Sequence, residues 1–157
     1  MPHYRSLKET ILPRAWLTIG VFDGVHRGHQ AILHRLNEEA AKSGAPSAVL
    51  TFAPHPASVL TGKEIKCLTT DEERAALLLG MGVEVVITEP FTRELSSVPA
   101  RDFMQRLKQS LGLECLFVGY DFALGKDREA TPPVWRRSAA NWITGSRWCR
   151  ESAMRAG

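Results

Sequence analysis

The sequence predicts an α/β fold in which a parallel sheet carries helices on both faces. Short continuous apolar runs, typical of strands buried on both sides, occur at 16–21, 48–52, 83–87 and 116–119. Segments with apolar residues at helical spacing lie between these runs, from about 29 to 42, from 70 onward and from 99 to 111. Because strands that alternate with helices pair in parallel, the pattern indicates one sheet built from crossover units.

Local signals mark where these elements begin and end. The first strand is interrupted at 22–24, the helix after it stops at Gly44, and the second strand ends at the prolines of 54–56. The second helix opens on a capping box at 70–73. The third helix follows Pro99. Its apolar face consists of Phe103, Leu107 and Leu111.

The composition is that of one soluble globular domain. Of 157 residues, 44% are hydrophobic and 24% are charged, which provides enough apolar surface for a core. No apolar run approaches the roughly 20 residues that span a bilayer, and residues 1–10 lack the apolar stretch of a signal peptide. We therefore expect a cytoplasmic protein without a membrane partner. The isolated Cys67, Cys115 and Cys149 predict reduced thiols rather than a zinc site or disulfide framework.

Charge and composition change near residue 131. The segment from Thr131 onward holds five arginines, one glutamate and three of the four tryptophans, and the strand–helix alternation stops there. This segment contributes +4 to the net charge of +3, so residues 1–130 carry −1 and indicate no specific nucleic-acid surface. We expect residues 1–131 to form the domain and residues 132–157 to form a poorly ordered tail.

Three loops are expected to meet at one edge of the sheet. They comprise residues 22–29, 53–56 and 120–126, and each follows a predicted strand. The carboxyl ends of parallel strands lie at the same edge, which is where open α/β sheets bind their ligands. The three loops therefore predict a single binding site.

The loop after the first strand has the chemistry of a phosphate site. Two histidines, His26 and His29, flank Arg-Gly between a strand and a helix. A helix N-terminus presents unpaired N–H groups and a partial positive charge to an anion, and Gly24 and Gly28 let the backbone approach without Cβ clashes. The imidazoles can donate hydrogen bonds to phosphate oxygens, which helps most where negative charge grows in a transition state.

Two other interpretations of this loop are possible. In the first, which stays open, Gly24 makes a tight turn and the two histidines cap the helix or lie on the surface. In the second, the histidines bind zinc, because two histidines three residues apart can share one ion. No further Cys, His or Asp has a suitable spacing, so we expect no metal held by the protein.

Three segments resemble prokaryotic FAD synthetases. The string GVFDGVHRGHQ at 20–30 is similar to the signature of the N-terminal domain of bifunctional riboflavin kinase/FMN adenylyltransferases. Its HxGH core is shared with a wider superfamily of Rossmann-like nucleotidyltransferases. TFAPHP at 51–56 and VGYDFALG at 118–125 resemble the family's TFxPHP and VGxDFxFG loops. Leu124 and Ala130 depart from the aromatic residue and the glycine that are usual there.

The resemblance implies a site divided between two ligands. Its catalytic residues are His26 and His29. Its ATP-binding residues are Gly20, Phe22, Asp23, Gly24, Gly28 and His29. Its flavin-binding residues are Phe52, Pro54, His55, Pro56, Asp121 and Phe122. For the two flavin loops a purely structural interpretation, a turn with exposed or core side chains, stays open.

The reaction implied by the resemblance is FAD synthesis from the small molecules ATP and FMN. The FMN phosphate attacks the α-phosphorus of ATP, pyrophosphate leaves, and Mg²⁺ is expected on the phosphates. Two alternatives stay open. One is another HxGH adenylyl- or cytidylyltransferase with a different phosphate acceptor, and the other is an inactive nucleotide- or flavin-binding fragment.

The resemblance ends near Thr131. The family continues with further strand–helix units, a Ser-Ser/Thr-x-x-Arg motif that binds ATP phosphates, and a riboflavin kinase barrel, and we find none of these in the sequence. A domain truncated or frameshifted after about residue 131 accounts for the tail rich in Arg and Trp. Such a domain is expected to leave an apolar sheet edge open and to have weak stability and weak or no adenylyltransferase activity.

Overall fold

The computed structural model describes residues 3–22, 27–54, 56–64, 66, 69–117, 142–144 and 147–149. Within these residues, one sheet contains seven strands in the order β1-β4-β3-β2-β5-β7-β6. The strands are β1 (His3–Tyr4), β2 (Ala15–Ile19), β3 (Ser47–Ala53), β4 (Val85–Pro90), β5 (Leu113–Phe117), β6 (Trp142–Thr144) and β7 (Arg147–Cys149). Strands β1 to β5 pair in parallel, whereas β7 pairs antiparallel with both β5 and β6.

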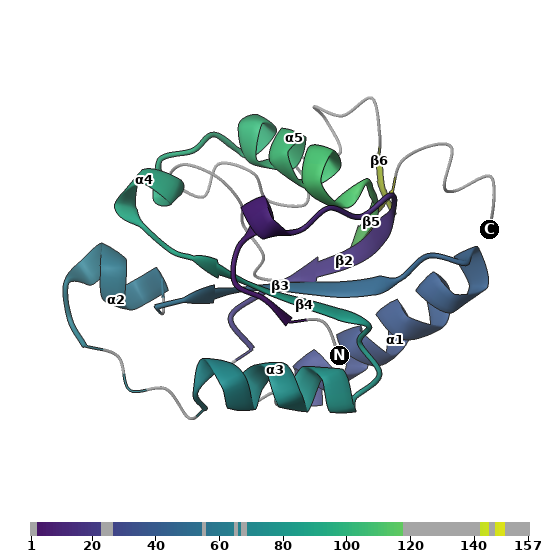
Figure 1. Ribbon diagram of the computed structural model, residues 1–157, viewed down its shortest axis with the longest axis horizontal. Coiled ribbons are helices and arrows are strands. Elements are labelled where there is room, and N and C mark those ends of the chain that lie inside the picture. The colour runs from purple at the N-terminus through teal and green to yellow at the C-terminus, as the bar shows by residue number, and fades with distance from the viewer. Residues whose placement is uncertain are drawn as a thin grey trace.

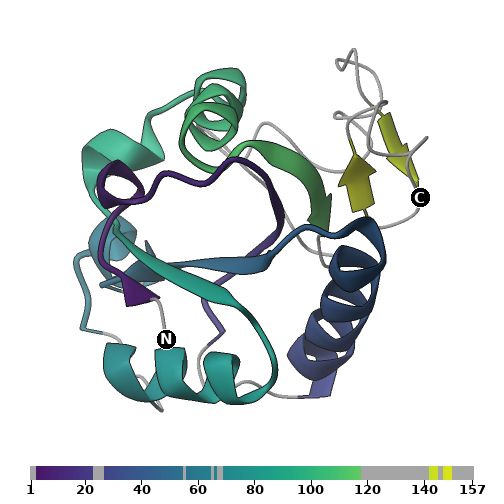
Figure 2. The ribbon, with the colours of Figure 1, turned by 45° about the vertical axis from the view of Figure 1, so that its right-hand side comes forward.

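Helices cover both faces of this sheet (Figure 1, Figure 2). They are η1 (Leu7–Glu9), α1 (Arg27–Ser43), α2 (Pro56–Thr61), α3 (Asp71–Gly80), α4 (Arg93–Ser96) and α5 (Ala100–Leu111). α1 and α3 pack on one face, whereas α5 and η1 pack on the other. The predicted parallel sheet with helices on both faces is therefore confirmed. No described helix combines the length and the hydrophobicity needed to cross a lipid bilayer.

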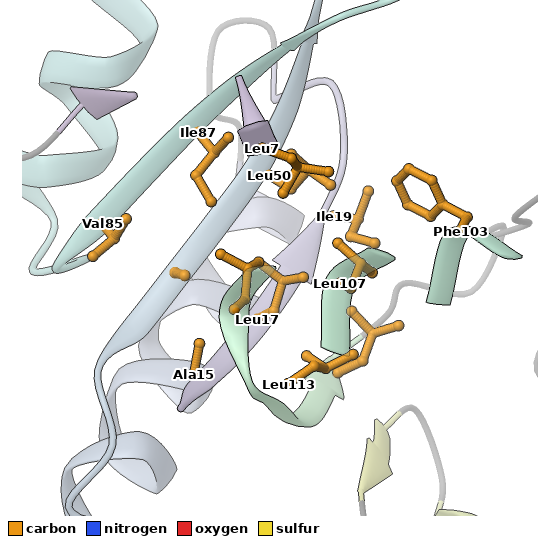
Figure 3. Close-up of a cluster of buried hydrophobic side chains, with 13 residues drawn as sticks. Leu7, Ala15, Leu17, Ile19, Leu50, Val85, Ile87, Phe103, Leu107 and Leu113 are labelled. Atoms are coloured by element: carbon orange, nitrogen blue, oxygen red, sulfur yellow. The ribbon is translucent and has the colours of Figure 1, made fainter. Parts of the chain in front are cut away.

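The larger core lies between the sheet and α5 (Figure 3). Leu17 and Ile19 of β2 belong to one buried cluster with Phe103 and Leu107 of α5. Trp16 belongs to a separate cluster on the α1 side. All five residues of β2 are buried, and each fully buried leucine stabilises the fold by roughly 1.5–3 kcal/mol. β2 is thus the central strand around which both layers assemble.

The predicted helices are confirmed within a few residues. α1 begins two residues before the predicted start, and α5 covers the predicted segment. Thr70 caps α3, because its side chain accepts a hydrogen bond from the Glu73 N–H at 3.1 Å. The predicted apolar face of α5 is buried, and it comprises Phe103, Leu107 and Leu111.

The four predicted strands are present with shifted bounds. β2 ends at Ile19 rather than at 21, β3 is one residue longer at each end, and β4 runs from Val85 to Pro90 rather than over 83–87. β5 begins at Leu113 rather than at 116, because polar Glu114 interrupts its apolar run. Glu114 accepts hydrogen bonds from Arg14 Nη2 and Trp16 Nε1 at 2.8 and 3.2 Å.

Two elements carry no clear signal in the sequence. β1 is two residues long, and it pairs with β4 with His3 opposite Val86. A 2.8 Å hydrogen bond between His3 Nε2 and Thr88 Oγ1 supports that pairing. α2 starts at Pro56, within a segment where the prolines predict only a turn. Both elements are too short for periodicity to reveal them.

The free edge expected at β5 is paired in the structure. β7 lies antiparallel to β5, with Cys149 opposite Cys115 and Trp148 opposite Leu116. Cys115 is disulfide-bonded, which corrects the expectation of reduced thiols at this position. β6 and β7 are the described part of residues 132–157, and the order of that segment as a whole stays a prediction.

Candidate functional site

The strands that lead into the three predicted loops lie side by side. β2 lies between β3 and β5, and all three strands run parallel. Their carboxyl ends are at Ile19, Ala53 and Phe117, at the edge where such sheets bind ligands. Residues 23–26, 55 and 120–126 lie outside the described residues, so the meeting of the loops themselves stays a prediction.

The HxGH motif lies at the start of α1. α1 begins at Arg27, so Gly28 and His29 belong to its first turn. The predicted transition from strand to helix N-terminus is therefore present, and that helix end is a favourable place for phosphate. The predicted residues Asp23, Gly24 and His26 lie outside the described residues, as does the side chain of His29. The contact of both imidazoles with phosphate therefore stays a prediction.

Gly20 and Phe22 form a close contact after β2. A Cβ at Gly20 would lie 2.8 Å from the Phe22 ring, so glycine leaves the space that the ring needs. Phe22 has a φ of 55°, and it is 2% exposed in a cluster with Leu33 and Leu78. The Phe22 ring thus packs against α1 and α3, and an ATP contact by this residue stays a prediction.

Two buried threonines hold the ends of neighbouring strands. Thr51 Oγ1 of β3 donates a hydrogen bond to the Val21 carbonyl at 2.9 Å, just before the HxGH segment. Thr18 Oγ1 of β2 donates to the Phe117 carbonyl at 2.9 Å, the last described residue of β5. Both threonines are almost completely buried. Sequence reasoning missed this role, although a threonine near the carboxyl end of an apolar strand is a usable signal.

The β3 loop, residues 53–56, carries part of the predicted flavin site. The Phe52 ring before it is half-buried and meets the Phe91 ring edge-on, with 5.6 Å between ring centroids. The Phe91 N–H donates to the Ala53 carbonyl at 3.0 Å. Pro54 is exposed, and Pro56 is half-buried as the first residue of α2. The sequence assigned no role to Phe91, which fixes this loop through both its ring and its backbone.

Three of the predicted flavin-binding residues lie outside the described residues: His55, Asp121 and Phe122. The structure therefore places Phe52, Pro54 and Pro56 at the same sheet edge as Gly20, Phe22 and Gly28. Contacts between these predicted flavin and ATP groups stay predictions.

A charged cluster surrounds β1 and the first turn of α3. Arg5 Nη2 and Glu72 Oε1 lie 2.6 Å apart, and this hydrogen bond holds the pKa of Glu72 below its ordinary value. Partial burial, aided by the Arg5 charge, holds the pKa of His3 below its ordinary value. Sequence reasoning missed this cluster, because β1 was not predicted.

The described side chains include no group of three or more His, Cys, Asp or Glu that could hold a metal ion. At the carboxyl edge, Thr18, Thr51 and Arg74 donate hydrogen bonds to backbone carbonyls and so hold the strand ends. The start of α1 is the part of this edge that favours an anion.

Comparison with known proteins gives consistent results. The sequence model for FAD synthetase matches residues 8–145. The bifunctional riboflavin kinase/FMN adenylyltransferase of Pseudomonas fluorescens is 45% identical over 112 residues, 71% of this chain and 36% of the relative. Its namesake in Listeria monocytogenes is 36% identical over 115 residues, 72% of this chain and 37% of the relative. A putative bifunctional riboflavin kinase/FMN adenylyltransferase of Geobacillus thermodenitrificans is 31% identical, covering 80% of this chain and 69% of the relative.

A solved structure shares the fold. It is titled a crystal structure of a macrolide-efflux protein from Streptococcus pneumoniae, with a TM-score of 0.70 and 25% sequence identity. The match covers 82% of this chain and 43% of that one. This chain spans little more than a third of the Pseudomonas and Listeria relatives. The matched segment 8–145 encloses the sheet core and all three loops, and the chain therefore belongs to the FAD synthetase family.

Proposed function

We propose that this chain is an FMN adenylyltransferase, which transfers AMP from ATP to FMN and releases FAD and pyrophosphate. The observation that carries the proposal is the place of Gly28 and His29 in the first turn of α1, the helix that follows the central parallel strand β2. The names of the curated relatives include this activity. The proposal concerns the segment that this chain shares with those longer relatives.

The phosphate half of the site consists of the β2 loop and the start of α1. In this proposal the imidazoles of His26 and His29 donate hydrogen bonds to the phosphates, and the amides of the first helical turn add to them. Gly24 and Gly28 allow the backbone to approach ATP, Gly20 and Asp23 belong to the same ATP-binding loop, and Phe22 supports the loop from beneath. Thr51 supports this half, because it fixes the Val21 carbonyl.

The flavin half consists of the β3 and β5 loops. Phe52, Pro54, His55 and Pro56 supply a rigid wall, and Asp121 and Phe122 bind the flavin from the neighbouring strand end. The prolines restrict the backbone, so the loop loses little entropy on binding. The fixed positions of Phe52 and Ala53 support this assignment.

The chemistry requires positioning and charge stabilisation more than a strong base. The FMN phosphate is already anionic at neutral pH and attacks the α-phosphorus in line, while the bond to pyrophosphate breaks. The residues at the edge suit this task, since they are hydrogen-bond donors at a helix N-terminus. Mg²⁺ is expected on the triphosphate, held by phosphate oxygens and water.

The source of the FMN and the partners of the protein are inferred from the family. The names of the curated relatives join FMN adenylyltransferase to riboflavin kinase, so we infer that a riboflavin kinase supplies the FMN. We propose that the protein works in the cytoplasm on these small molecules, without a specific nucleic-acid or membrane partner.

A direct assay tests the function. Purified chain is incubated with FMN, ATP and Mg²⁺, and FAD is quantified by chromatography. We expect slow FAD formation that falls at least about a hundredfold when His26 and His29 are both replaced by alanine. His34→Ala is the matched control, because His34 lies on the same helix, and its side chain is 79% exposed. Equal loss in the control would contradict the assignment.

Binding titrations with FMN and ATP, and assays with CTP or other phosphate acceptors, separate the alternatives. FMN and ATP binding without turnover would indicate an inactive fragment, in line with the missing Ser-Ser/Thr-x-x-Arg motif. Turnover of CTP, or of ATP with a phosphate acceptor other than FMN, would indicate another member of the nucleotidyltransferase superfamily.

A further inference from the structure

Arg74 is a buried arginine in the first turns of α3. It is 2% exposed, although arginine is rarely buried without a specific reason. Removing a guanidinium from water is costly unless polar groups compensate it. The contacts of Arg74 therefore indicate what its charge is used for.

Arg74 joins α3 to the carboxyl end of β3. Its Nη2 lies 2.9 Å from Asp71 Oδ1 and donates a second hydrogen bond to the Phe52 carbonyl at 3.3 Å. Its Nε is buried without a hydrogen-bond partner among the described residues. The ion pair with Asp71 is local to the helix, whereas the bond to Phe52 crosses to the sheet.

The Phe52 carbonyl lies at the beginning of the β3 loop. The next residue, Ala53, ends the strand, and its carbonyl accepts a hydrogen bond from the Phe91 N–H. The Phe91 ring also meets the Phe52 ring edge-on. Arg74 of α3 thus restrains the start of the β3 loop, which Phe91, directly after β4, also holds.

We propose that Arg74 is a positioning residue for flavin: it fixes the Phe52 carbonyl and thereby the direction in which the β3 loop leaves the sheet. This inference rests on the proposed function. It assigns the effect to the flavin half, because ATP is assigned to the β2 loop, whose end is held by Thr51 instead. Arg74 itself touches neither the substrates nor the reacting atoms.

The test compares two arginine–carboxylate pairs in the full chain. Arg74→Met removes the contact with Phe52, and Arg74→Lys keeps the charge. Arg14→Met is the matched control, because Arg14 pairs with Glu114 at 2.8 Å and also has a buried Nε without a partner among the described residues. Arg14 precedes β2, so it lies at the opposite edge of the sheet.

Two measurements are made on each variant. Hydrogen exchange reports the protection of segment 50–54 and of the Phe91 amide, and fluorescence titration gives separate dissociation constants for FMN and ATP. Arg74→Met is expected to raise the rate of hydrogen exchange in segment 50–54. It should also raise the FMN dissociation constant about tenfold, while the ATP dissociation constant changes less than about twofold. Arg74→Lys should restore much of the FMN affinity, and Arg14→Met should leave both constants unchanged.

Several outcomes would overturn the inference. Unchanged exchange in segment 50–54, or an equal loss of FMN and ATP affinity, would show that Arg74 serves only the general stability of the fold. If Arg74→Met fails to fold, Arg74→Lys provides the test. Hydrogen exchange and FMN affinity equal to those of the wild type in Arg74→Lys would contradict the positioning role of Arg74. A wild-type chain that binds ATP but not FMN would overturn the proposed function and this inference with it, whatever the exchange data show.

Discussion

The two edges of the parallel sheet use polar groups differently. At the carboxyl edge, Thr18, Thr51 and Arg74 each donate to a backbone carbonyl within two residues of a strand end. At the amino edge, Glu114 of β5 accepts from the side chains of Arg14 and Trp16 and so links β5 to β2. The difference teaches that polar side chains fix backbone beside the predicted loops at one edge and join neighbouring strands at the other.

The largest effect is expected at the amino edge, from Gly112→Ala. Gly112 has a φ of 54°, and an added Cβ would lie 2.2 Å from the Pro13 carbonyl oxygen. We expect a loss of about 3 kcal/mol in the free energy of unfolding, measured by denaturant titration. Ligand affinity per folded molecule should stay unchanged.

Gly44→Ala is the control for that variant. Gly44 also has a positive φ, of 76°, but no atom lies near an added Cβ. It should therefore cost only about 1 kcal/mol, the conformational term alone. Equal losses at the two glycines would mean that the close approach to Pro13 does not matter.

The next largest effect compares substitutions at the two ends of β3. Thr51→Val keeps the shape but leaves the Val21 carbonyl without its donor, which should cost about 1–2 kcal/mol. Because that carbonyl precedes the HxGH segment, we also expect weaker ATP binding in a titration. Ser47→Ala removes the hydroxyl that accepts from the Glu84 N–H at the amino end of the same strand. If Ser47→Ala weakened ATP binding as much, the distinction between the edges would fail.

A smaller effect is expected for Glu114→Gln. The carboxylate accepts from Arg14 and Trp16, but the Arg14 side chain is 36% exposed, so water screens the pair. We expect a loss of about 1 kcal/mol in unfolding free energy and no change in affinity for ATP or FMN. Glu38→Gln on α1 is the control, with an expected change near zero. A change in FMN affinity in Glu114→Gln would contradict the separation of the edges.

The smallest effect concerns pH and His3. Because the pKa of His3 is lowered in the folded state, its contribution is fully present above its ordinary value of 6.5. That contribution is lost as the pH falls through the lowered pKa. Denaturant titrations at pH 8 and pH 5.5 should therefore show less acid destabilisation in His3→Asn than in the wild type. Equal pH dependence in the two proteins would refute this assignment.

The sequence predicted the architecture because its signals are local. Buried strands appear as apolar runs, and the helical spacing of Phe103, Leu107 and Leu111 shows which face of α5 is buried. The position of the HxGH segment between β2 and α1 follows from the same patterns. The spacing does not reveal β1, because a two-residue strand is recognisable only by its partner, β4.

The sequence by itself determined the fold class and the capping box at 70–73, since both depend on residues within a few positions of one another. Only the tertiary structure decided which groups hold the backbone beside the predicted loops in place. Arg74 reaches a carbonyl 22 residues away, and Thr51 reaches one 30 residues away. The physical reason is that the donor and the carbonyl come from different elements, and only chain folding brings them within hydrogen-bonding distance.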